Sequence, residues 1–173
     1  MRIALSPHKY CPTYTKNLIP SMAEDTKPRT FNPEGVPLPP PTYNHLCITP
    51  LILGSVDLVT LAGLTGIDAS SSTNPKAVPE QARIAYQKIK ICLAAANATP
   101  RDIVQVRHYI VKVTGNPEVE KLDVVDRGWG EAWIEFMDYE AEGHRPPDTV
   151  VGVACLATKD ILYECEVWAV VRK

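Results

Sequence analysis

The run Leu162–Val171 reads LYECEVWAVV, and from Glu164 onward its side chains alternate in character. Successive side chains of a β-strand point to opposite faces, so this alternation predicts a strand. Glu164, Glu166 and Trp168 share one face of it, and the residues between them share the other. Carboxylates beside an aromatic side chain can carry protons, which makes this strand the first candidate for a chemical site.

The preceding run, Thr149–Leu156, is apolar on both of its alternating faces. Such a strand needs cover on both sides, whereas two helices cover only one face of a sheet of this size. We therefore expect the other face to meet another subunit, and that contact can also build the site. Asp148 stands just before this run and joins Glu164 and Glu166 as an acid at the mouth of the two strands.

Hydrophobic periodicity predicts the other elements of the fold. Apolar runs on both sides of a Gly/Asp turn indicate a hairpin, and apolar residues at steps of three and four indicate two helices. Trp129 and Trp133 fall on the inner side of the second helix, where we expect them in the core. The expected elements are strands over 45–53, 58–64 and 103–113, a turn over 54–57, and helices over 79–96 and 122–139. With the two closing strands, the order ββαβαββ predicts an α+β fold with both helices on one face of the sheet.

The segment 1–41 has a different composition from the rest of the chain and holds more than half of the 16 prolines. Proline lacks an amide donor, so this arm is excluded from the interior of a sheet. Two alternatives stay open: the arm wraps around the body, or it is disordered. We therefore divide the chain into a proline-rich arm, 1–41, and an α+β domain, 42–173.

Composition limits the classes of function. A chain of 173 residues with 45% hydrophobic residues forms one globular domain, and a net charge of -2 without a basic run argues against a nucleic-acid partner. No stretch approaches the roughly 20 apolar residues of a membrane span, and the N-terminus lacks the core of a secretory signal. The five cysteines lack a CxxC spacing, and four of them fall in predicted strands or a helix, as buried thiols of a reducing compartment do. We expect a cytoplasmic protein.

Five short motifs, in the right order and at matching spacings, resemble the Rid (reactive intermediate deaminase, YjgF-like) family over about residues 41–172. The resemblance implies a chorismate-mutase-like α+β fold, assembled as a homotrimer with a cleft between each pair of subunits. The motifs are Pro41-Thr42-Tyr43-Asn44-His45, Leu61-Ala62-Gly63, Gln81-Ala82-Arg83, Asp102-Ile103-Val104 and Glu164-Cys165-Glu166-Val167-Trp168-Ala169. The resemblance also implies that the cleft is lined by Tyr43, Gly63, Lys88, Asp148, Val150 and Glu166.

One departure from the family concerns charge. Imine-hydrolysing members carry an arginine eight residues before the leucine that ends the penultimate strand, where it holds the substrate carboxylate. Counting back from Leu156 reaches Asp148, and an aspartate repels the carboxylate that an arginine would clamp. Arg145 is a candidate replacement, although Pro146 and Pro147 restrict the backbone between them. Lys88, where many relatives have asparagine, is a further difference at the cleft.

We therefore expect a cofactor-independent enzyme that performs acid-base chemistry on a small neutral or cationic carbonyl, enol or imine compound. Asp148 and Glu166 are the predicted acid and base, and Tyr43 is the predicted hydrogen-bond donor to the substrate. Substrate contacts are expected from Gly63, Lys88, Arg145, Val150 and Trp168. The same proton carriers serve hydrolysis, dehydration and tautomerisation, so the reaction stays open. By analogy, an altered pocket and a long arm suit secondary-metabolite biosynthesis.

Two other functions remain open: imine or enamine deamination of the ordinary Rid type, and a ligand-binding trimer without chemistry. In the second, the acids are the polar edge of a half-solvated strand. A metal site is disfavoured because the four histidines lack an HxH or HExxH pattern. Neither a GxSxG motif nor a Gly-rich phosphate loop is present, so we expect no nucleophilic serine and no cofactor.

Overall fold

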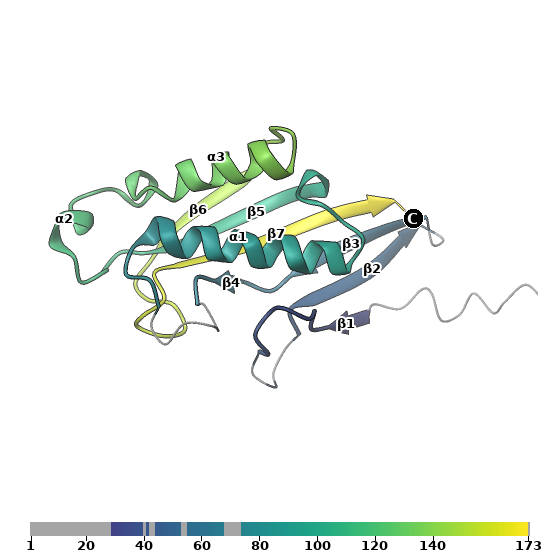
Figure 1. Cartoon of the computed structure of the whole chain (residues 1–173), viewed down its shortest axis with the longest axis horizontal. Coiled ribbons are helices and arrows are strands. Elements are labelled where there is room, and N and C mark those ends of the chain that lie inside the picture. Colours follow the sequence, from purple (N-terminus) through teal and green to yellow (C-terminus); the bar gives the residue numbers. More distant parts are fainter. Residues whose placement is uncertain (1–28, 40, 42–43, 53–54, 68–73, 173) are drawn as a thin grey trace, which may run out of the picture.

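The computed structural model describes residues 29–39, 41, 44–52, 55–67 and 74–172 (Figure 1). One mixed sheet runs through this part of the chain in the order β1-β2-β3-β7-β5-β6, and β4 pairs with β7 beside β3. The strands are β1 Arg29–Phe31, β2 Leu46–Ile52, β3 Val56–Leu61, β4 Leu64–Thr65, β5 Ile103–Val111, β6 Asp148–Val153 and β7 Tyr163–Arg172. The predicted ββαβαββ order is confirmed, with two short strands added.

The arm contributes one of the added strands. β1 pairs antiparallel with β2 at the edge of the sheet, from Arg29 opposite Ile48 to Phe31 opposite Leu46. An edge position agrees with the expectation that a proline-rich segment stays out of the sheet interior. The next residues turn back over the body, where Val36 is buried. Of the two alternatives for the arm, residues 29–39 follow the first and wrap, whereas residues 1–28 lie outside the described part.

The second strand of the first hairpin is shifted from its predicted range of 58–64. β3 begins at Val56, inside the predicted turn, and ends at Leu61, while Leu64 belongs to the separate short strand β4. β2 and β3 pair antiparallel from Leu46 opposite Leu61, with an irregularity between Pro50 and Ile52. Proline cannot donate to a ladder, and Pro50 lies beyond Ile48, where the pairing of β2 with β1 stops.

Two helices cover one face of the sheet, as predicted: α1 Val78–Ala95 and α3 Trp129–Glu140 (Figure 1). Trp129 and Trp133 are each 5% exposed and belong to the core, which confirms their expected role. The prediction that the second helix starts at residue 122 was wrong. Gly128 has a left-handed backbone with φ 77°, which ends the preceding turn and starts α3 one residue later.

Residues 117–127 form short turns instead of a continuous helix: α2 Pro117–Glu120 and the 3₁₀ turn η2 Val124–Asp126. The buried guanidinium of Arg127 stabilises them by donating to the carbonyl oxygens of Leu122, Val111 and Lys112. A second 3₁₀ turn, η1 Pro100–Asp102, connects α1 to β5. Side-chain bonds to the backbone thus replace the helical ladder in a segment whose apolar spacing alone resembled a helix.

β6 runs parallel to β5 and ends at Val153, three residues earlier than expected. β5 ends at Val111, which pairs with Val153, so residues 154–156 have no strand of β5 to continue along. The expectation that Cys155 is a buried strand residue was therefore wrong, because its side chain is exposed. Cys92 and Cys165 are buried as predicted, and Cys47 is partly buried.

The core between the sheet and the helices contains a polar network. Tyr163 on β7 shares hydrogen bonds with the hydroxyl of Tyr86 at 2.7 Å and with Nδ1 of His108 at 2.5 Å. Burial lowers the pKa of His108 to about 3 and raises the pKa of Tyr163 and of Tyr86 well above the usual value for tyrosine. All three side chains are therefore neutral at physiological pH, and the network stabilises the core without carrying charge.

Candidate functional site

Alternation along β7 separates two environments, as the sequence predicted. Tyr163, Cys165 and Val167 are buried under the helices, whereas Glu164, Glu166 and Trp168 are partly exposed on the opposite face. The two carboxylates and the indole of Trp168 therefore lie on the face of the sheet that no described helix covers. The candidate site is built from this face and from the loops at the start of β7.

Three donors hold the Glu166 carboxylate. Arg107 Nη1 lies 2.9 Å from Oε1, Trp168 Nε1 donates to Oε1 at 3.1 Å, and the Tyr109 hydroxyl donates to Oε2 at 3.2 Å. The Arg107 guanidinium also lies 5.2 Å from the centre of the Trp168 ring, within cation-π range. The carboxyl group of Glu166 is therefore held in place by three donors, one of them cationic.

Sequence reasoning missed Arg107 and Tyr109. Both lie on β5, whose pairing with β7 sets Arg107 opposite Glu166 and Tyr109 opposite Glu164. The alternation of β5 places Arg107 and Tyr109 on the same face, which the sequence could have predicted. The sequence could not predict that β7 is the neighbour of β5, because no local pattern shows which strands pair.

Glu164 lies in a different environment from Glu166. Burial and, to a smaller extent, the negative charge of Glu166 raise the pKa of the Glu164 carboxyl group. That carboxyl group packs directly against Gly63, at which a β-carbon would overlap Glu164 Oε1. Gly63 is therefore required for the close approach, and Glu164 is the acid on this face whose proton is held more tightly than usual.

A hollow of about 480 Å³ opens beside this carboxyl group. Its two walls are the segment that follows β3 and the loop that leads into β7. Of the lining residues that the structure describes, Glu164 alone has an ionisable side chain, and the others offer apolar groups and two threonine hydroxyls. The lining residues are Ala62, Gly63, Thr65, Ile67, Ala157, Thr158, Ile161 and Glu164. We call this cavity the Glu164 hollow.

A smaller hollow of about 180 Å³ lies on the other side of the same segment. Val36 to Pro39 of the arm form part of its wall, together with Gly63 and Lys88. The ammonium group of Lys88 donates to the carbonyl oxygen of Thr65 at 2.9 Å and to that of Ile67. Lys88, a predicted substrate contact, thus anchors the segment that separates the two hollows.

Asp148 and Glu166, the predicted acid and base, are not brought together within one protomer. Asp148 is exposed at the start of β6 and pairs with Val106, whereas Glu166 pairs with the next residue of β5, Arg107. Adjacent strand positions face opposite sides, so the two carboxylates belong to opposite faces of the sheet. Val150, two residues after Asp148, is partly buried and packs against the core.

Arg145, the candidate replacement for the family arginine, is engaged at the end of α3. Its Nη2 lies 2.5 Å from Asp138 Oδ1, and both side chains are about half exposed. Tyr43, the predicted hydrogen-bond donor, lies outside the described residues. Gly63 and Trp168, two predicted substrate contacts, therefore lie beside Glu164 and Glu166 respectively, and Arg145 lies away from both at Asp138.

Within the described ranges, no group of three or more His, Cys, Asp and Glu side chains is arranged to hold a metal ion. The Nε2 atom of His144, one of the four histidines, lies 2.7 Å from the carbonyl oxygen of Ile103. None of the helices in the same ranges combines the length and apolar character needed to cross a membrane.

The fold is shared with solved structures of bacterial proteins. E. coli TdcF with bound serine is 24% identical, with a TM-score of 0.64 over 83% of this chain and 98% of that one. The YjgF gene product of E. coli is 22% identical, with a TM-score of 0.63 over 82% of this chain and 98% of that one. Rv2704 from Mycobacterium tuberculosis, a member of the YjgF/YER057c/UK114 family, is 23% identical, with a TM-score of 0.60 over 84% of this chain and 100% of that one.

A comparison with curated protein sequences found no match. The family model described as Endoribonuclease L-PSP matches residues 42–171, which is most of the chain. That range contains both hollows apart from the arm residues, and it contains the whole of β7 except its last residue. The chain belongs to the Endoribonuclease L-PSP family, also known as the YjgF or Rid family.

Proposed function

We propose that this protein is a cofactor-independent enzyme that uses Glu164 for acid-base chemistry on a small neutral or cationic carbonyl, enol or imine compound. Membership of the YjgF family supports a small-molecule metabolic or binding role. One observation carries the step to chemistry: the Glu164 carboxyl group borders a hollow of about 480 Å³ and has a raised pKa. A perturbed acid in a concave site is a candidate catalytic group on physical grounds.

A raised pKa lets one carboxyl group serve in both protonation states. In its acid form Glu164 donates a proton to a carbonyl oxygen or an imine nitrogen, and in its ionised form it accepts a proton from carbon or water. Efficiency is greatest when the pKa of the group approaches the working pH, and burial beside Gly63 moves Glu164 in that direction. Tyr43 remains the proposed donor to the substrate oxygen or nitrogen.

Glu166 has a supporting role in this proposal, which changes the role expected from the sequence. Its carboxylate accepts from Arg107, Tyr109 and Trp168, so it is held in one position beside a cation. Its charge is one of the two causes that raise the pKa of Glu164. The two neighbouring carboxyl groups thus have different surroundings and different roles: Glu164 carries the proton, and Glu166 raises the pKa of Glu164.

Asp148 contributes through a second protomer. Within one protomer its carboxylate belongs to the opposite face from Glu166, so any pairing of the two acids requires another copy of the chain. β6 is the last strand of the sheet and Asp148 is exposed at its start, which leaves the aspartate accessible to a neighbour. In a homotrimer with clefts between subunits, Asp148 would add negative charge to the site of the adjacent protomer.

The charges of the site favour a substrate without a carboxylate. Among the described residues that line the Glu164 hollow there is no arginine, lysine or histidine, and Asp148 replaces the arginine that binds the substrate carboxylate in deaminating relatives. The description of the family also names RNA cleavage. RNA phosphates require cationic partners, so the lining residues and the net charge of -2 do not favour that activity for this chain.

The first test measures proton exchange at carbon in D₂O. Hydroxyacetone is the neutral probe, pyruvate is its anionic counterpart, and proton NMR follows loss of the α-proton signal. We expect exchange of hydroxyacetone above the buffer rate, with a loss of about 100-fold in Glu164→Gln and a smaller loss in Glu166→Gln. Glu131→Gln changes an exposed acid on α3 and is the matched control. Full activity in Glu164→Gln would rule out the proposed proton carrier.

The second test replaces Asp148 with the arginine that deaminating relatives carry at this position. In Asp148→Arg, we expect binding of pyruvate to strengthen and exchange of hydroxyacetone to weaken, because a guanidinium attracts the carboxylate that the aspartate repels. Glu142→Arg makes the same charge change at an exposed position after α3 and controls for net charge. If both variants respond alike, Asp148 does not act at the site. Ammonia release by the native protein from amino-acid-derived imines would favour ordinary deamination instead.

A further inference from the structure

We infer that Gln81 is a positioning residue for Glu164: it ties the loop before β7 and the start of β7 to α1, and so holds the Glu164 carboxyl group against Gly63. The inference rests on the proposed function only in naming Glu164 as the proton carrier. The structural part is independent of any reaction.

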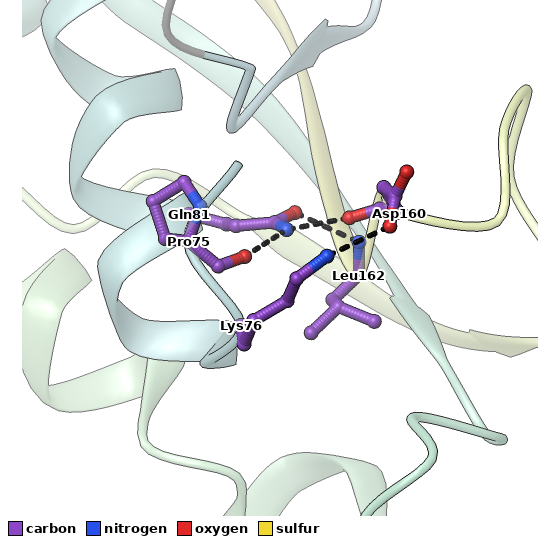
Figure 2. Close-up of polar contacts among 5 residues, drawn as sticks. All are labelled: Pro75, Lys76, Gln81, Asp160 and Leu162. Atoms are coloured by element: carbon purple, nitrogen blue, oxygen red, sulfur yellow. Dashed lines mark hydrogen bonds and ion pairs between the residues drawn. The ribbon is translucent and has the colours of Figure 1, made fainter. Parts of the chain in front are cut away.

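Gln81 is a polar side chain that is only 1% exposed, in the first turn of α1. Both ends of its carboxamide are used (Figure 2). The amide nitrogen donates to the carbonyl oxygen of Pro75 at 2.8 Å and to that of Asp160 at 2.7 Å. The oxygen accepts from the backbone N–H of Leu162 at 2.7 Å and of Tyr163 at 3.3 Å.

The two accepted bonds fix the backbone immediately before Glu164. β7 begins at Tyr163, so Gln81 holds its first residue and the residue that precedes it. The direction of a strand side chain follows from the backbone at its own and neighbouring positions. Holding Leu162 and Tyr163 therefore sets the side of the strand on which Glu164 emerges and its distance from Gly63.

Gln81 contacts both walls of the Glu164 hollow, one through its carboxamide and the other through its backbone and the start of its side chain. Its bond to Asp160 holds the loop that supplies Thr158 and Ile161 to one wall. On the other wall, Gly66 packs against Gln81 so closely that a β-carbon at residue 66 would overlap the Gln81 side chain and backbone. Thr65 and Ile67 flank this glycine and line the hollow. One buried residue thus connects the two walls.

Only a carboxamide satisfies all four partners. Its nitrogen has two donor hydrogens and its oxygen has two acceptor lone pairs, which matches two backbone carbonyls and two backbone N–H groups. Methionine has a similar length but makes none of these bonds. Glutamate keeps the acceptor oxygen. Its second oxygen would face two carbonyl oxygens in a buried site, so the carboxyl group should take up a proton there and keep one of the two donor hydrogens. The two substitutions therefore separate the bonds that the Gln81 oxygen accepts from those that its nitrogen donates.

Lys76, which lies just before α1, offers a matched control because it contacts the same loop through Asp160. Its ammonium group lies 2.8 Å from Asp160 Oδ1, with both side chains more than 60% exposed (Figure 2). Exposed ion pairs contribute little, so Lys76→Met should leave the loop in place. Comparing the variants at Lys76 and Gln81 therefore shows whether the exposed ion pair or the buried hydrogen bonds to the backbone of Leu162 and Tyr163 hold the loop.

The test compares Gln81→Met, Gln81→Glu and Lys76→Met by amide hydrogen exchange and by kinetics with hydroxyacetone. In Gln81→Met, we expect exchange at Leu162 and Tyr163 to accelerate at least about tenfold, with Leu93 of α1 unchanged. We expect kcat to fall by about 10- to 100-fold with a smaller change in KM, because a displacement of about 1 Å costs that much. In Lys76→Met, both quantities should stay within about twofold of the native values.

Gln81→Glu covers the case in which Gln81→Met does not fold. Because the acceptor is kept, we expect Leu162 and Tyr163 to remain protected and kcat to lie between those of the native protein and Gln81→Met. Native-like exchange at both amides in Gln81→Met would overturn the inference. So would loss of their protection in Gln81→Glu. Where Glu164→Gln loses activity, accelerated amide exchange in Gln81→Met with an unchanged kcat would overturn it as well.

The two proposals fail in different ways. If Glu164→Gln keeps full activity, the proposed function fails, yet accelerated exchange and a shifted carboxyl titration of Glu164 in Gln81→Met would still support positioning by Gln81. In the opposite case, Glu164→Gln loses activity, whereas Gln81→Met keeps native amide exchange at Leu162 and Tyr163, a native titration of Glu164 and a native kcat. The proposed function then stands, and the positioning role of Gln81 is overturned.

Discussion

The two faces of β7 differ in what lies over them. We call the face under α1 and α3 the covered face, and the face that no described helix covers the open face. Tyr163 and Cys165 lie under the helices, where Tyr163 joins His108 and Tyr86 in a neutral network with strongly shifted pKa values. Glu164 and Glu166 lie on the open face, where Glu166 has a cationic partner and Glu164 borders a hollow. A perturbed pKa therefore marks stability on one face and a candidate for chemistry on the other. Access to a ligand, together with charge, distinguishes the two cases.

The largest effect on the open face is expected from Gly63→Val. The added side chain would occupy the space of the Glu164 carboxyl group and displace it from the hollow. Because the displaced atoms are the end of a flexible side chain, the fold should persist while exchange of hydroxyacetone falls by about 100-fold or more. NMR measures the exchange, and thermal unfolding checks the fold.

Gly130→Ala is the matched control for that substitution, since nothing lies within contact distance of a β-carbon at this helical position. It should keep native activity, and it should gain stability by about 0.5–1 kcal/mol because alanine favours a helix. Equal activity losses in both glycine variants would show that the hollow is not the site.

On the covered face, the clearest expectation concerns pH. The pKa of His108 is lowered to about 3 by burial, below its ordinary value in the unfolded chain, so the unfolded state binds a proton as the pH falls and the folded state does not. Its contribution to stability is therefore fully present above about pH 6.5 and is lost progressively below it. Between pH 8 and pH 5 this loss amounts to about 2 kcal/mol.

Urea unfolding of the native protein and of His108→Gln at a fixed protein concentration measures this contribution. The glutamine variant should show the weaker dependence of unfolding free energy on pH, by about the same 2 kcal/mol over that range. Parallel curves for the two proteins would mean that His108 takes up a proton as readily in the folded state as in the unfolded state. That result would contradict a neutral His108 in the core.

The Tyr163 hydroxyl tests whether the covered face serves stability alone. Tyr163→Phe removes a buried group that bonds to Tyr86 and His108, so the unfolding free energy should fall by about 1–3 kcal/mol with little change in exchange of hydroxyacetone. Tyr139→Phe removes an exposed hydroxyl and should be neutral in both measurements. A large loss of activity in Tyr163→Phe alone would assign the network to catalysis and would remove the contrast between the faces.

The smallest effect on stability is expected from Arg107→Met. Its ion pair with Glu166 is partly exposed, so its loss should cost under about 1 kcal/mol, similar to the loss of the Lys90–Glu140 pair in Lys90→Met. The pH dependence of activity separates the two variants. Without the cation, the negative charge near Glu164 is less compensated, so the pH profile should move to higher pH in Arg107→Met only.

Local patterns predicted the elements of this fold well where one periodicity dominated. The alternation of Glu164, Cys165 and Glu166 and the apolar stripe of α1 both gave correct faces. Predictions failed where non-local contacts decide. The carbonyl contacts of Arg127 and the left-handed Gly128 delay α3, and the end of β5 at Val111 ends β6 before Cys155.

The candidate site was predicted in part. Glu166, Gly63 and Trp168 follow from alternation and from the resemblance to the family, whereas Arg107 and Tyr109 depend on which strand lies beside β7. The relation between Asp148 and Glu166 depends on register, which moves a side chain to the other face with each step of one residue. The burial that raises the pKa of Glu164 depends on the folded surroundings of its carboxyl group, among them Gly63, and these are not visible in the local pattern of β7.

The most direct test is a carbon NMR titration of the Glu164 carboxyl group in the native protein and in Glu166→Gln. A proton carrier in the hollow should titrate above the ordinary range of glutamate, because burial and the charge of Glu166 both raise its pKa. Removal of that charge in Glu166→Gln should lower the midpoint without returning it to the ordinary range, since burial is the larger cause. A native midpoint at or below that of an exposed glutamate would contradict the account.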